Sequence, residues 1–67
     1  MGGLIMNVIL IYKIENGERE RYEAFDNEVY AVKEMYRLHK KGIRYDTEEN
    51  ELNCFDDETR EWIENNL

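Results

Sequence analysis

The 67-residue sequence contains no proline, no serine and no glutamine, and it has only one cysteine, Cys54, and one histidine, His39. Without serine the chain cannot hold a Ser-His-Asp triad, and a single cysteine excludes an internal disulfide. The absence of proline and serine, together with only four glycines, leaves no Pro-rich or Gly/Ser-rich linker to divide the chain. These absences predict one small domain.

Long apolar stretches are absent too. The longest, from Val8 to Tyr12, is far too short to span a bilayer, so no membrane association is expected. The first residues lack a charged segment followed by a cleavage site, and a lone cysteine is typical of reducing compartments. We therefore expect a cytoplasmic protein in which residues 1–6 form a disordered extension and residues 7–67 form the domain.

Negative charge is abundant but very unevenly distributed. The formal net charge is −7, from nine Lys/Arg and 16 Asp/Glu. Residues 1–45 contain eight basic and seven acidic residues, whereas residues 46–67 contain nine acidic residues and a single basic one, Arg60. One end of the fold should be strongly negative, which repels nucleic acid and attracts basic proteins. Direct binding to DNA or RNA is therefore not expected.

A four-residue stretch, Phe25-Asp26-Asn27-Glu28, returns thirty residues later as Phe55-Asp56-Asp57-Glu58. An aspartate just before a helical pattern accepts hydrogen bonds from the first turn, and its charge suits the positive end of the helix. Asp26 and Asp56 are therefore the predicted N-caps. The recurrence predicts an internal ββα duplication with repeat halves at about residues 7–41 and 43–67.

Asn16-Gly17 is the strongest turn signal, because this pair favours a two-residue hairpin turn between strands at residues 7–14 and 18–25. Counting outward from the turn pairs Ile11 with Tyr22 and Ile9 with Ala24, and we assign these four side chains to the core. The reversed assignment of the two faces is the alternative. The opposite face carries four large apolar side chains that we expect to be exposed as an interface, namely Val8, Leu10, Tyr12 and Ile14.

The next segment, residues 27–41, has the period of an amphipathic helix, and Gly42 is placed to end it in a left-handed conformation. Its apolar stripe, which includes Val32, Tyr36 and His39 and has Val29 at its edge, is expected to pack on the sheet. The basic residues in its last turn complement the negative end of the helix.

The last third of the chain is expected to contain two strands and a helix. Residues 43–47 and 51–55 have strand-like patterns on either side of a polar turn at residues 48–50, and a short helix starts at Asp57. Trp62 is expected to hold this helix to the sheet. The predicted fold class is α+β, ββαββα, a four-stranded and mostly antiparallel sheet with two helices on one face.

Few residues suggest catalysis or metal binding. Cys54 and His39 are conceivable as a nucleophile–base pair in a thiol-dependent enzyme, but a core-facing cysteine behaves as a small hydrophobic residue. Asp46 and Glu48 have the spacing of calcium-loop ligands, yet Glu51 stands where the sharp turn of that loop needs glycine. We expect no enzyme activity, no catalytic residue, no metal and no cofactor.

The composition favours a small acidic protein-interaction module, which forms a homodimer or binds a basic protein. The short, acidic make-up without serine or proline is similar to that of many phage and bacterial open reading frames, so a phage or mobile-element origin is an expectation. A DNA-mimic inhibitor of a nucleic-acid-binding enzyme is the alternative. The predicted acidic surface for a partner comprises seven residues: Glu48, Glu49, Glu51, Asp57, Glu58, Glu61 and Glu64.

Overall fold

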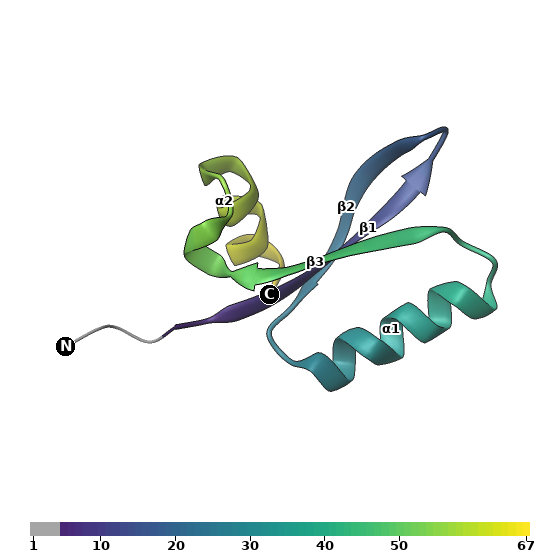
Figure 1. The fold of residues 1–67 in the computed structure, drawn as a ribbon, viewed down its shortest axis with the longest axis horizontal. Helices are drawn as coiled ribbons and strands as arrows, with labels where there is room; N and C mark the ends of the chain where they lie inside the picture. The colour runs from purple at the N-terminus through teal and green to yellow at the C-terminus, as the bar shows by residue number, and fades with distance from the viewer. Residues whose placement is uncertain (1–4) are drawn as a thin grey trace.

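The computed structural model describes residues 5–67 (Figure 1). These residues form an α+β fold with two α-helices and a three-stranded antiparallel sheet of order β2-β1-β3. Residues 1–4 of the predicted N-terminal extension lie outside the described residues. The elements are β1 (Asn7–Glu15), β2 (Glu18–Phe25), α1 (Glu28–Lys40), β3 (Tyr45–Glu51), the 3₁₀ helix η1 (Leu52–Cys54) and α2 (Asp57–Asn66).

The predicted third strand is present with different bounds, but the predicted fourth strand is wrong, because β3 runs straight through the expected turn at residues 48–50. It pairs with β1 from Tyr45, opposite Lys13, to Glu51, opposite Asn7. The turn residues include neither glycine nor proline, so nothing in them forces a reversal, and continued pairing along β1 satisfies the backbone. Residues 5–67 therefore show neither a fourth strand nor a ββαββα duplication.

The recurring four-residue stretch does precede a helix in both places, but its two copies act differently. Asp56 is at the predicted N-cap position of α2, but its side chain forms no capping hydrogen bond. The predicted cap Asp26 is wrong, since Asn27 is the N-cap of α1 and its side-chain oxygen accepts a 2.8 Å hydrogen bond from the backbone N–H of Val29. An amide oxygen satisfies a free donor of the first turn as a carboxylate would, so the helix begins one residue later.

The β1–β2 hairpin contains a bulge that changes which side chains share a face. Asn16 and Gly17 have φ angles of 54° and 79°, as a type I′ turn requires, and the predicted register holds from the turn to the pair Tyr12–Arg21. Beyond that pair the register shifts by one residue at Tyr22, so Ala24 lies opposite Leu10. The predicted pairs Ile11–Tyr22 and Ile9–Ala24 are therefore wrong.

The two helices lie on opposite sides of the sheet, as Figure 1 shows. The expectation that both cover one face is wrong. Side chains alternate along a strand, so Ile9 and Ile11 point toward α1, where Ala31 and Leu38 are buried. The other face packs under α2, with Leu52 and Trp62 against its edge, and its buried cluster contains Val8, Leu10, Tyr12, Ala24, Phe55 and Ile63.

The predicted exposed interface on β1 is consequently part of the core. Val8 and Leu10 are fully buried, Tyr12 is 8% exposed and Ile14 is half-buried. The physical reason is that β1 is the central strand and has a helix on each side, so both of its faces leave water. The exposed apolar surface of this protein lies elsewhere.

Candidate functional site

A hollow of about 750 Å³ opens between α2 and the sheet face that α2 covers. It combines two arginines, three acidic residues, a tyrosine, a tryptophan and a cysteine, which are residue types that bind ligands or catalyse reactions. The lining residues are Tyr12, Arg19, Glu20, Arg21, Glu48, Cys54, Phe55, Asp56, Thr59 and Trp62.

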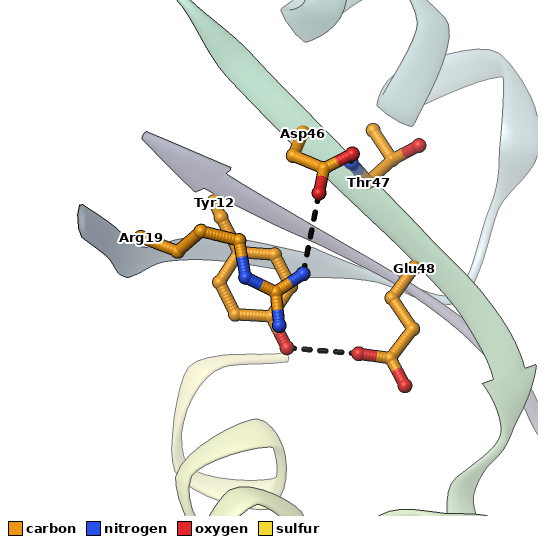
Figure 2. A network of polar contacts seen from close by, with 5 residues as sticks. All are labelled: Tyr12, Arg19, Asp46, Thr47 and Glu48. Carbon is orange, nitrogen blue, oxygen red and sulfur yellow. Dashed lines mark hydrogen bonds and ion pairs between the residues drawn. The ribbon is translucent and has the colours of Figure 1, made fainter. Parts of the chain in front are cut away.

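A network of polar contacts joins the three strands at one wall of this hollow (Figure 2). The Tyr12 hydroxyl on β1 donates a 2.9 Å hydrogen bond to the Glu48 carboxylate on β3. The guanidinium of Arg19 on β2 lies 4.1 Å from the centroid of the Tyr12 ring and forms a 3.2 Å ion pair with Asp46. The other oxygen of Asp46 accepts a 2.9 Å bond from the backbone N–H of Thr47. The Tyr12 hydroxyl and both carboxylate oxygens of Asp46 are thus engaged within the molecule.

The protonation of Tyr12 follows from this setting. Burial raises the pKa of the Tyr12 phenol, and the hydrogen bond to the Glu48 carboxylate raises it further. The phenol therefore stays protonated at neutral pH and serves as a hydrogen-bond donor, and it is unsuited to act as a base.

A second set of contacts ties the first turn of α2 to β2. One nitrogen of Arg21 donates 3.0 Å hydrogen bonds to the Glu58 carboxylate and to the Thr59 hydroxyl. The Thr59 side chain lowers the pKa of the Asp56 carboxyl, with smaller lowering by backbone groups and by Arg21. Both arginines of the hollow are thus paired with carboxylates of the same molecule. The arrangement positions the first turn of α2 on β2.

The structure does not bring Cys54 and His39 together. Cys54 is exposed at the end of η1 and lines the hollow under α2, whereas His39 is exposed on α1 and lines a different, shallower hollow near Gly42. The predicted core positions of both side chains are wrong. The possible calcium ligands Asp46 and Glu48 lie on an extended strand, and residues 5–67 contain no cluster of three His, Cys, Asp or Glu placed to hold a metal.

The predicted acidic surface is divided between β3 and α2. Three of its members are engaged within the molecule, since Glu48 is half-buried against Tyr12, Glu58 is paired with Arg21 and Asp57 is paired with Arg60. Asp57, which lies 2.6 Å from Arg60, is on the outer side of α2 together with Glu61 and Glu64. The members exposed on β3 and α2 are Glu49, Glu51, Asp57, Glu58, Glu61 and Glu64.

The outer face of α1 is an exposed apolar surface that sequence reasoning missed. Val29, Val32 and Tyr36 lie within one narrow arc of the helix, opposite the buried Ala31 and Leu38. The exposed fractions are 61% for Val29, 60% for the neighbouring Tyr30, 50% for Val32 and 62% for Tyr36. The sequence did contain a signal for this surface, because the apolar arc of α1 is wider than the part of a helix that a three-stranded sheet covers.

Two lysines lie against the tyrosines of this face. The ammonium of Lys33 is 5.8 Å from the centroid of the Tyr30 ring, and that of Lys40 is 5.5 Å from the Tyr36 ring. Such cation–π contacts at exposed sites are weak, but they hold the charges close to the apolar surface. The outer face of α1 is therefore apolar with basic flanks, on a protein that is acidic as a whole.

A hydrogen-bonded group on the inner side fixes the orientation of α1 on the sheet. The Tyr22 hydroxyl on β2 donates a 2.5 Å bond to the Glu34 carboxylate, which also forms a 3.2 Å ion pair with Arg37. The bond from Tyr22 lowers the pKa of Glu34, and the same bond raises the pKa of Tyr22. Since the Glu34 side chain is only 15% exposed, this contact directs Val29, Val32 and Tyr36 away from the sheet.

Replacing Tyr22 with phenylalanine should destabilise the protein by about 1 kcal/mol at pH 7, because the charged Glu34 loses a hydrogen bond. A lowered pKa means that the contribution of Glu34 is complete above its ordinary pKa of 4.5 and is lost as the pH falls through the folded-state pKa. The stability difference between the parent and Tyr22→Phe should therefore narrow as the pH falls below 4.5. Urea denaturation at pH 7 and pH 3 measures the difference in free energy of unfolding between the two proteins. An equal difference at both pH values would contradict the stabilising role of the bond between Tyr22 and Glu34.

Membrane insertion and known relatives provide no further guide to function. Within residues 5–67, neither helix has the length and apolar character needed to cross a bilayer. Comparisons with protein-family models, curated proteins and solved structures found no match to this chain.

Proposed function

We propose that the protein is a non-enzymatic protein-interaction module that binds its partner through the outer face of α1. The observation that carries this proposal is the exposure of Val29, Tyr30, Val32 and Tyr36 on one helix. Contiguous apolar surface with a polar rim is typical of protein-binding sites, and aromatic residues are enriched in the cores of interfaces. The sheet, which we first expected to provide the interface, is covered on both faces.

The hollow under α2 supports this proposal indirectly. Its arginines are paired with Asp46 and Glu58, and Tyr12 is a hydrogen-bond donor whose raised pKa keeps it protonated at neutral pH. These contacts join β1, β2, β3 and α2 into one unit. The hollow thus has the features of a structural junction, which holds a small scaffold rigid while a helix face binds.

A pull-down from a lysate of the source cells tests the proposal. The bait proteins are the parent, Val32→Glu on the outer face of α1, and Asn65→Glu, which adds the same charge at an exposed position of α2. We expect a protein that the parent and Asn65→Glu retain, and that Val32→Glu loses by roughly tenfold or more, because a buried charge at an interface is costly. Identical sets of retained proteins for all three baits would reject the proposed surface.

The acidic outer side of α2 supports a second candidate, binding of a basic protein or mimicry of DNA. Asp57, Glu61 and Glu64 share one side of this helix, in a segment with nine acidic residues and one basic residue. A partner of this kind would bind more weakly as salt increases. In the same pull-down, loss with Glu61→Lys together with retention by Val32→Glu would favour this candidate over the outer face of α1.

A further inference from the structure

We infer that the outer face of α1 binds a second copy of the chain, with the two α1 helices packed antiparallel across a two-fold axis. This inference deepens the proposed function and rests on it. It names the partner, the surface and the relative direction of the helices.

The distribution of charge along α1 makes the helix complementary to itself in the antiparallel direction. Its N-terminal end carries exposed acidic residues, Asp26 and Glu28, and its C-terminal end carries exposed basic residues, Lys40 and Lys41. Turning a second helix by 180° places the acidic end of each copy beside the basic end of the other. The helix dipoles are then also opposed, which is the favourable arrangement. A parallel pair would instead place like charges together.

The centre of the proposed contact is apolar. An antiparallel pair centred near Val32 places Val29 of one copy close to Tyr36 of the other. Lys33 is the one charged residue near this centre, and its ammonium lies over the Tyr30 ring at the side of the face. Its charge is thus drawn away from the two-fold axis, where it would meet its counterpart.

The position of the acidic half of the molecule removes the main objection to self-association. Each chain has a net charge of −7, and that excess arises from residues 46–67. Nine of the 16 acidic residues lie there, on β3 and in the region of α2, and α2 is on the opposite side of the sheet from α1 (Figure 1). Contact through α1 therefore keeps the two α2 helices at the far ends of the dimer, where their repulsion is weakest.

The available area predicts a reversible dimer. From the size of tyrosine and valine side chains, Val29, Val32 and Tyr36 offer on the order of 300 Å² per copy, or roughly 600 Å² in the pair. That lies below the size of stable complexes and in the range of transient ones. A dissociation constant in the micromolar range is expected, so concentration must be varied to see both species.

Sedimentation equilibrium over a concentration series, at low salt, tests the inference. The parent should show a monomer–dimer equilibrium, and Val32→Glu should weaken it by roughly tenfold or more. Two charge variants, Lys40→Glu/Lys41→Glu and Asp26→Lys/Glu28→Lys, should each associate several-fold more weakly than the parent. An equimolar mixture of the two variants should recover the parent's affinity, because opposite charges then meet at both ends. Circular dichroism confirms that each variant is folded.

Three results would overturn the inference: a monomeric parent at about 1 mM, a dimer that Val32→Glu does not weaken, or a mixture no tighter than its components. Failure here is distinguishable from failure of the proposed function. One outcome is a monomeric parent together with a protein other than this chain that the parent retains and Val32→Glu loses. In that case the outer face of α1 is the binding surface, and its partner is that other protein. If Val32→Glu changes neither the set of retained proteins nor the dimer affinity, both proposals are rejected.

Discussion

Leu10→Glu is expected to leave the chain unfolded at 25 °C. Leu10 is fully buried in the central strand under α2, so the substitution removes its packing and places a carboxylate among apolar side chains. Loss of the packing alone costs about 2–5 kcal/mol, and an unpaired buried charge adds several more. A domain of this length has a total stability of only about 3–10 kcal/mol. Far-UV circular dichroism with a thermal scan measures the result.

Val32→Glu is the matched control, since it introduces the same carboxylate at a half-exposed position of α1. Its free energy of unfolding should lie within about 0.5 kcal/mol of the parent's at a concentration where the protein is monomeric. A cooperatively folded Leu10→Glu variant would show that α2 does not cover this face, and it would restore the exposed sheet interface that the sequence first suggested.

Ile63→Ala is expected to detach α2 while the rest of the fold persists. Ile63 is fully buried against the cluster under α2, and removal of its side chain leaves a cavity that costs about 2–4 kcal/mol. A ten-residue helix is not stable in water without packing, so the loss falls first on α2 itself. Hydrogen exchange should show a large fall in the protection of α2 amides and a smaller fall in β1.

Leu67→Ala provides the comparison for this second prediction, because Leu67 follows the same helix and is 50% exposed. It should change the exchange of α2 amides very little. If Ile63→Ala reduces protection in α2 no more than Leu67→Ala does, then the contacts of Arg21 with Glu58 and Thr59 hold the helix in place of its apolar packing.

Local signals in the sequence predicted the elements that depend on local chemistry. Asn16-Gly17 predicted the hairpin turn, and the structure confirms it with positive φ angles at both residues. Gly42, with φ of 73°, lies just after α1 as predicted. The bulge at Tyr22 could not be predicted in this way, because the first four pairs of the ladder fit the unbroken register equally well. One additional residue then changed the face on which Ala24 lies.

The candidate surface was missed because of a wrong inference about layers. Val8 to Tyr12 are five successive apolar residues in the sequence, and all five are buried in the structure. An unbroken apolar run of this kind is typical of a strand that is covered on both faces. Dividing the run into a core half and an exposed half placed both helices on one side. The apolar residues of α1 were then all assigned to the sheet. A three-stranded sheet covers only the arc around Ala31 and Leu38, and Val29, Val32 and Tyr36 therefore face water.

The outer border of β3 has a consequence for the behaviour of the protein at high concentration. The ladder bonds from Ile14 N–H to the Arg44 carbonyl and from Leu52 N–H to the Met6 carbonyl show that even-numbered residues of this strand face β1. The amides of Thr47 and Glu51 thus point outward, yet each donates to the preceding side chain, Asp46 or Asn50, at 2.9 Å. Fibril growth by strand addition needs those donors, and the adjacent carboxylates repel incoming strands of the same sequence. The two engaged amides and the negative charge thus make this border of the sheet less able to accept a further strand.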